Sequence, residues 1–287
     1  MLKGLIFMKN MSGSAALIAG EGVLPEETAR QMVGAGMDVT VYSFTGGAED
    51  RFPFLPKDRV LSLLSLPGCE GKLSLQALLA DLRTRGILSV CMAGLIPKTI
   101  MYGDGTADSS LLGMLSPGTN DDHSLLGRIV AAFESFGLQV LPYAGFVGES
   151  LAAEGFLAGR EPSDNEREDV SCGKRILSVT LPLSFGQSVV VARGAVVAVE
   201  AMEGTDEMIR RAGKLLSGAP GVVVKMMRPD QDIRFDLPTV GTGTLRAMSA
   251  AGLTCLAVEA GRTIILDRPG FASLAESLSI AVEGITP

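Results

Sequence analysis

The densest group of ionisable side chains lies at 225–244, which reads KMMRPDQDIRFDLPTVGTGT in a chain that is only 20% charged. Pro229 and Pro238 exclude a regular helix there, so the segment is predicted to be a loop. Its charged and amide side chains are Lys225, Arg228, Asp230, Gln231, Asp232, Arg234 and Asp236. Such a loop can direct carboxylates and cations at one polyanionic substrate. A solvated loop whose ion pairs neutralise one another is the alternative.

The overall composition limits the class of protein. With 287 residues, 47% of them hydrophobic, the chain can form one large or two medium domains, each with a core. A net charge of −7, no Trp and only three Tyr argue against nucleic-acid binding. No uncharged apolar run reaches the roughly 18 residues of a membrane span. Four cysteines without CxxC spacing argue against disulfides and structural zinc, and favour a cytoplasmic protein.

The first half of the chain alternates predicted strands and helices. Short apolar runs at 15–19, 38–44, 87–93 and 138–141 are typical of buried parallel strands. Periodic apolar patterns predict helices at 26–33, 74–85 and 125–133. Because a glycine turn and a helix separate the first two strands, we expect a doubly wound α/β sheet.

Gly20, Glu21 and Gly22 form the turn after the first predicted strand, where a helix N-terminus can bind an anion. Pro25 stands where a dinucleotide fingerprint needs its third glycine, and the second strand ends without an acid for a ribose hydroxyl. A nicotinamide or flavin role is therefore disfavoured. Nucleotide binding and a tight turn without a ligand both stay open.

Two further polar positions lie near element ends. Lys98 follows the strand at 87–93, at the edge where open α/β sheets bind ligands, and is a candidate phosphate contact. Asp121 and Asp122 precede the helix at 125–133, where acids stabilise the helix dipole and can also bind a metal or a ribose. His123, the single histidine, has no His or Cys partner nearby in sequence and is not expected to be catalytic.

The most polar run, REPSDNERED at 160–169, separates two halves of the chain. We therefore predict an N-terminal domain at 1–142, a linker at 143–164 and a C-terminal α/β domain at 165–287. Predicted helices of the second half lie at 165–181, 207–216, 244–251 and 271–281. Predicted strands lie at 189–191, 195–201, 222–226, 253–259 and 263–266.

Polar residues also gather before the helix at 207–216. Thr205 can cap that helix and Asp206 can stabilise its first turn, which is a sufficient structural account of both. No such account covers Glu200 and Glu203, which follow a predicted strand.

Four segments, in order, resemble the LpxI family of UDP-2,3-diacylglucosamine diphosphatases: IAGEGVLP at 18–25, AVEAMEGTDEMIRRAG at 198–213, QDIRFDLPTVG at 231–241 and GLTCLAVEAGRTIILDR at 252–268. The resemblance covers almost the whole chain from Ser14 onward. EGTD before a helix and xRxDLPTxG are specific when they occur together, whereas either alone is a modest signal. Cys69, Cys91 and Cys172 lie outside these segments.

The resemblance implies an α/β protein with an N-terminal Rossmann-like parallel-sheet domain and a C-terminal mixed α/β domain. It implies an enzyme of lipid A biosynthesis that hydrolyses UDP-2,3-diacylglucosamine to UMP and 2,3-diacylglucosamine 1-phosphate, known as lipid X. Substrate would lie in a cleft between the domains, and water would attack the β-phosphorus. A divalent cation, Mg²⁺ or another such as Mn²⁺, would be required.

The family's essential aspartate lies in the RxDLP motif and corresponds here to Asp236. The expected catalytic residues are Asp236, Arg234, Asp232 and Lys225. Asp236 and Asp232 are the expected metal ligands, since Mg²⁺ usually binds one or two carboxylates. Arg234 and Lys225 would hold phosphate oxygens. The residues expected to bind substrate are Gly20, Glu21, Gly22, Leu24, Lys98, Asp122, Gln187, Glu203, Gly204, Thr205, Asp206, Gln231 and Thr239.

The expected partners follow from the substrate, which is a membrane amphiphile. We expect transient contact with the cytoplasmic face of the inner membrane, and weak association, because no basic amphipathic helix stands out. A homodimer is compatible with the sequence. The alternative function is a non-catalytic nucleotide- or lipid-binding regulator on the same frame, which the acid and base density at 231–236 disfavours.

Overall fold

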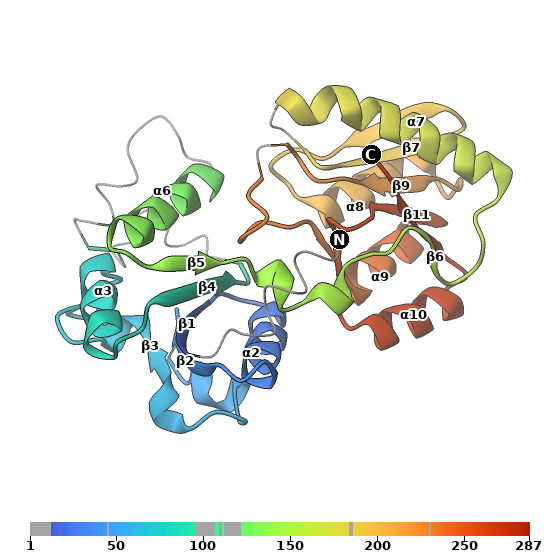
Figure 1. Cartoon of the computed structure of the whole chain (residues 1–287). Coiled ribbons are helices and arrows are strands. Elements are labelled where there is room, and N and C mark those ends of the chain that lie inside the picture. The colour runs from blue at the N-terminus through green and yellow to red at the C-terminus, as the bar shows by residue number, and fades with distance from the viewer. Residues whose placement is uncertain are drawn as a thin grey trace. The chain divides into compact units, whose positions relative to one another are not determined.

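The computed structural model describes residues 13–44, 46–95, 107–108, 111, 122–183, 186–229 and 231–287. The chain forms two compact units (Figure 1). The first contains the chain up to Val147 together with Ile233–Asp236, and the second contains Gly148–Asp232 and Leu237–Pro287. The short segment Ile233–Asp236 thus belongs to the first unit, although its neighbours in the chain belong to the second. The limits of a linker at 143–164 stay a prediction.

A five-stranded parallel sheet forms the centre of the first unit, in the order β3-β2-β1-β4-β5. The order reverses between β1 and β4, and open α/β sheets bind ligands beside such a switch point. The strands are β1 (Ser14–Ala19), β2 (Asp38–Ser43), β3 (Val60–Ser62), β4 (Ser89–Ala93) and β5 (Gln139–Leu141). The described helices are α2 (Leu24–Gly34), α3 (Leu75–Thr84) and α6 (Asp122–Ser135), with short 3-10 helices η1 (Ala48–Arg51), η2 (Lys57–Arg59), η3 (Leu63–Ser65) and η4 (Tyr143–Gly145).

Helices cover both faces of this sheet (Figure 1). Ile18 and Val90 point to the face that α3 and α6 cover, where they share one core cluster with Leu78 and Phe133. Successive side chains of a strand point to opposite faces, and Leu17 is fully buried as well. Burial on both faces explains why these strands are continuously apolar in sequence.

The second unit is built on a six-stranded mixed sheet in the order β6-β13-β11-β9-β7-β8. A separate parallel pair joins β10 to β12. The strands are β6 (Gly155–Ala158), β7 (Ser188–Ala192), β8 (Ala195–Val199), β9 (Val222–Lys225), β10 (Thr239–Val240), β11 (Cys255–Glu259), β12 (Ile264–Ile265) and β13 (Ala281–Ile285). The helices are η5 (Gly148–Ser150), α7 (Asp164–Thr180), η6 (Leu181–Leu183), α8 (Thr205–Leu216), α9 (Thr242–Ala251) and α10 (Arg268–Ser277).

This unit has three layers (Figure 1). Val189 and Val224 pack in the cluster on the α7 face. Val190 and Val223 pack in the cluster that contains residues of α8, α9 and α10. Alternate residues of each strand therefore enter different cores, and the sheet holds its polar groups at its ends.

The predicted fold class is confirmed, since a parallel sheet comes first and a mixed sheet second. Four short strands were missed: β3, β6, β10 and β13. The helix predicted at 271–281 is wrong at its end, because α10 stops at Ser277 and the chain turns at Ser279, whose φ is 54°. β13 then pairs with β11 and β6. Pairing between distant segments selected strand for this apolar run, which periodicity alone could not distinguish from helix.

Candidate active site

A buried polar cluster lies at one end of the second unit's sheet. Lys225, the last residue of β9, is only 4% exposed, and its ammonium group donates to the Thr205 hydroxyl oxygen at 2.8 Å. Thr205 in turn donates to a carboxylate oxygen of Glu200 at 3.2 Å. The Ser188 hydroxyl oxygen lies 3.4 Å from the Thr205 hydroxyl oxygen. The antiparallel register pairs Ser188 directly with Lys225. The strand register therefore assembles a lysine, two hydroxyls and a carboxylate from separate parts of the chain.

The N-terminus of α8 lies in the same cluster, because Thr205 is its first residue. Gly204 precedes it with φ 84°, a conformation that side chains rarely adopt, and no side chain caps the helix. The first amide groups of a helix carry a partial positive charge. A helix N-terminus beside a buried lysine is suited to an anion such as phosphate.

Glu203 and Asp206, both expected to bind substrate, differ in their surroundings. The Glu203 carboxylate accepts from the Ala201 N–H at 3.1 Å and pairs with Arg211, and the Arg211 hydrogen bond lowers its pKa. Arg211 also donates to the Val199 carbonyl, so Glu203 stabilises the turn between β8 and α8. Asp206 is exposed in the first turn of α8, as the dipole account expects.

We expect the Thr205→Val variant to be less stable than the wild type by about 1–3 kcal/mol, because a valine of similar shape cannot bond to Lys225 or Glu200. Thr205→Ser retains the hydroxyl and is the matched control. Urea unfolding followed by circular dichroism measures both. Equal midpoints for the valine and serine variants would show that the hydroxyl contributes no stability.

Side chains also hold the start of the loop after β9. The Met227 N–H donates to Glu259 at 2.8 Å, and the Arg228 N–H donates to the Gln231 amide oxygen at 2.8 Å. Glu259, the last residue of β11, is 1% exposed. The Met226 N–H donates to the Gln187 carbonyl at 2.9 Å. Successive amides are therefore satisfied by groups from three segments.

Several of these positions were not predicted. Glu200 was noted without a role, and Glu259 was missed, although an acid that ends a fully apolar strand is a signal in the sequence CLAVE. Gln231 and Gln187 were expected to bind substrate. Gln231 supports the loop, whereas the side-chain oxygen of Gln187 is buried without a hydrogen-bond partner among the described residues. An unsatisfied buried acceptor is suited to a donor from a ligand or water.

The two aspartates expected to bind metal are both half-buried. Asp232 belongs to the second unit and Asp236 to the first. Within the described part of the chain, no three His, Cys, Asp or Glu side chains gather as a metal site. Binding of Mg²⁺ by Asp232 and Asp236 stays a prediction, since Mg²⁺ usually takes only one or two carboxylates and keeps several waters.

Arg234 is held within the first unit. Its guanidinium donates to Glu134 of α6 at 2.6 Å, and its carbonyl oxygen accepts from the Tyr143 N–H at 3.2 Å. Glu134 was not predicted from sequence. Because this pair is partly exposed, a phosphate could compete with Glu134 for the guanidinium.

The glycine turn after β1 is largely satisfied by the protein itself. The Gly20 and Glu21 N–H groups donate to the carbonyls of Ala93 and Leu95, both at 2.8 Å. A β-carbon on Gly20 would lie 2.4 Å from the Leu95 oxygen, so only glycine allows this approach. These two amides are therefore committed to the end of β4, and an anion at this turn would depend on Gly22 and Leu24.

Arg51, which sequence reasoning missed, fixes the other side of the turn. Its guanidinium donates to the Gly20 and Gly22 carbonyls at 3.3 and 2.7 Å, and to Glu26 at 3.1 Å. The turn is thus rigidly held by one arginine. Three other residues were expected to bind substrate. Lys98 lies outside the described residues, and Asp122 begins α6 but its side chain is not described. Thr239 begins β10, and its hydroxyl donates a hydrogen bond to the Leu237 carbonyl.

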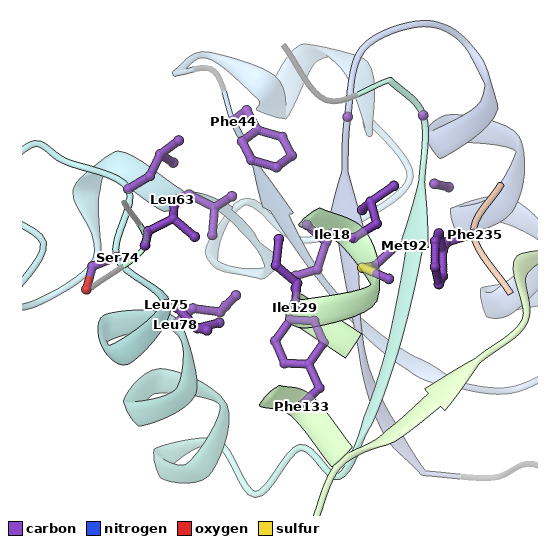
Figure 2. A pocket seen from close by; sticks show the side chains of 16 residues that line it. Ile18, Phe44, Leu63, Ser74, Leu75, Leu78, Met92, Ile129, Phe133 and Phe235 are labelled. Carbon is purple, nitrogen blue, oxygen red and sulfur yellow. The ribbon is translucent and has the colours of Figure 1, made fainter. Parts of the chain in front are cut away.

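An apolar cavity opens in the first unit beside the ends of β1 and β4. Figure 2 shows Ile18 and Met92 from these strands, with Phe133 from α6 and Phe235 from the segment Ile233–Asp236. Among the described lining residues, Ser74 has the single polar side chain. The empty volume is about 710 Å³ with the open mouth included.

Comparison with known proteins supports the resemblance. Residues 14–150 match the model of the LpxI N-terminal domain, and residues 153–283 match that of the LpxI C-terminal domain. The chain is 30% identical to UDP-2,3-diacylglucosamine pyrophosphatase LpxI of Caulobacter vibrioides over 285 residues, 94% of this chain and 97% of that protein.

Among solved structures, a short chain dehydrogenase from Mycobacterium smegmatis matches with 14% identity over 94% of this chain and 87% of that one. Its TM-score of 0.17 is too low to carry an argument. The two domain matches and the full-length relative agree with the order of the motifs, and the chain belongs to the LpxI family.

Proposed function

We propose that this protein hydrolyses the pyrophosphate bond of UDP-2,3-diacylglucosamine, releasing UMP and 2,3-diacylglucosamine 1-phosphate. The family and the name of the Caulobacter relative support this activity. The substrate combines a charged pyrophosphate with two acyl chains. The protein must therefore present polar and apolar surfaces to one molecule.

One observation carries the proposal. Phe235 lines the apolar cavity, and it stands in the chain between Arg234 and Asp236. A wall residue of an apolar cavity is thus directly bonded to the expected catalytic residues. An amphiphilic substrate accounts for this combination, whereas a free nucleotide does not account for the cavity.

Each of the polar groups can be assigned a separate role in the reaction. Lys225 and the N-terminus of α8 would bind phosphate oxygens, and Arg234 would bind another after leaving Glu134. Asp236 would orient the attacking water or accept its proton, and the expected attack is on the β-phosphorus. A divalent cation held by Asp236 and Asp232 would neutralise charge on the pyrophosphate. The proposal requires that one substrate molecule contact residues of both units.

The setting of the reaction is also a proposal. Within the residues that the structure describes, none of the helices has the length and apolar composition needed to cross a bilayer. Because the substrate is a membrane amphiphile, we expect a cytoplasmic protein in transient contact with the inner membrane. Homodimer formation stays a prediction.

An assay with UDP-2,3-diacylglucosamine in detergent micelles tests the function. We expect UMP release with Mg²⁺ and at least a tenfold loss of rate with excess EDTA, which added Mg²⁺ restores, since the cation would stabilise charge in the transition state. In ¹⁸O-water the label should enter the lipid phosphate and not UMP.

Three outcomes would contradict the proposal in different ways. Label in UMP would place the attack on the α-phosphorus. Full activity in EDTA would remove the cation from the mechanism. Tight binding without UMP release would favour the non-catalytic regulator.

A further inference from the structure

The segment Ile233–Asp236 is attached to the first unit at three points. The Arg234 side chain pairs with Glu134 of α6, and its carbonyl oxygen accepts from the Tyr143 N–H. Phe235 packs against the core cluster that contains Ile18 and Phe133. The position of this segment therefore depends on packing inside the first unit.

Phe235 lines the cavity from outside the regular helices and strands. It lies in a turn, whereas Phe133 lies in α6, where backbone hydrogen bonds hold the helix. Loops generally open at lower free energy than core helices. An acyl chain that enters the cavity would contact Phe235, whose turn can shift at a lower cost in free energy than α6.

We propose that Phe235 couples acyl-chain binding to the placement of Arg234 and Asp236. The inference rests on the proposed function. Adjacent Cα atoms are about 3.8 Å apart, so a shift of the Phe235 backbone moves both neighbours. The binding energy of the acyl chain is then used to position the reacting groups, which raises kcat and does not only lower KM. Phe235 is thus a positioning residue and not a catalytic one.

The experiment compares the long-chain substrate with an analogue that carries two short acyl groups on the same UDP-glucosamine. For the wild type we expect kcat on the short-chain analogue to be lower by roughly 10- to 100-fold, the range that a misplacement of about 1 Å can cause. For Phe235→Ala, kcat on the long-chain substrate should fall at least to that short-chain level, and the ratio of the long-chain to the short-chain kcat should approach one. Phe235→Leu should give an intermediate kcat on the long-chain substrate, and it replaces Phe235→Ala in the comparison if the alanine variant does not fold.

Phe133→Leu is the matched control, since Phe133 lines the same cavity from α6. It should raise KM for the long-chain substrate, and its effect on kcat should be clearly smaller than that of Phe235→Leu. A wild-type kcat that does not depend on chain length would overturn the coupling and leave the proposed function intact. Equal effects of the Phe235→Leu and Phe133→Leu variants on kcat would overturn the role of Phe235. Absence of UMP release from both substrates would instead refute the proposed function itself.

Discussion

Asp236→Asn is expected to reduce kcat for UDP-2,3-diacylglucosamine hydrolysis by roughly 10²- to 10⁴-fold, the usual contribution of a positioned acid or base. The amide has nearly the same shape but cannot accept a proton, and it is a poorer ligand for a hard cation. Because the side chain is only half-buried, the fold should tolerate the exchange. UMP release at saturating substrate and Mg²⁺ measures the effect.

Asp50→Asn is a suitable control, since Asp50 is an exposed aspartate of η1 in the same unit and has no role in the proposal. Asp232→Asn, measured beside it, tests the second expected metal ligand. It should raise the Mg²⁺ concentration needed for half-maximal rate, because one carboxylate is lost. Full turnover by a folded Asp236→Asn protein would be incompatible with the mechanism.

The largest expected effect on stability comes from Glu166, which organises the start of α7. Its carboxylate accepts hydrogen bonds from both terminal nitrogens of Arg160, at 2.8 and 2.6 Å, and from the Thr254 hydroxyl at 2.6 Å. Ser163 and Glu166 form a capping box. Burial alone would raise the pKa of Glu166, but the bonds from Arg160, Thr254 and Ser163 lower it to about 2.

Glu166→Gln should therefore reduce the free energy of unfolding by up to about 3 kcal/mol at pH 7, which is the value of this pKa shift. The folded pKa lies below the ordinary value of 4.5, so the contribution is complete above about pH 4.5 and is lost as pH falls toward 2. The difference in the free energy of unfolding between the wild type and the variant should become smaller as the pH falls over that range. Urea unfolding at pH 7 and pH 3.5, followed by circular dichroism, measures it.

Glu168→Gln removes an exposed carboxylate from the same helix and should change stability by less than about 0.5 kcal/mol. A pH-independent difference between wild type and Glu166→Gln would mean that shape, and not charge, explains the effect. Equal stability of the Glu166→Gln and Glu168→Gln variants would refute the role of Glu166 altogether.

Local sequence was sufficient where one segment alone decides the structure. Buried strands such as β1, β4 and β9 were predicted because each is continuously apolar. α8 was predicted from its amphipathic pattern and its first-turn acids. β6 and β13 were missed because each is a strand only through pairing: β6 pairs with β13 across more than 100 residues of chain, and β13 pairs with β11 as well.

The sequence by itself determined the family, through the order of its motifs, and the alternation of strands and helices, because both depend only on residues that are close together in the chain. It also placed Asp236 in a specific motif. Only the tertiary structure decided which polar groups meet. Strand register pairs Ser188 with Lys225, and the start of α8 brings the Thr205 hydroxyl both to the Lys225 ammonium group and to the Glu200 carboxylate.

The tertiary structure alone also decided that Ile233–Asp236 packs with the first unit while the residues on either side belong to the second. The physical reason is that Phe235 packs against apolar residues, and Arg234 pairs with Glu134, on elements much earlier in the chain. Spacing along a sequence carries no information on such distant packing. The charged loop that a composition count singles out therefore holds an apolar residue that connects it to a cavity.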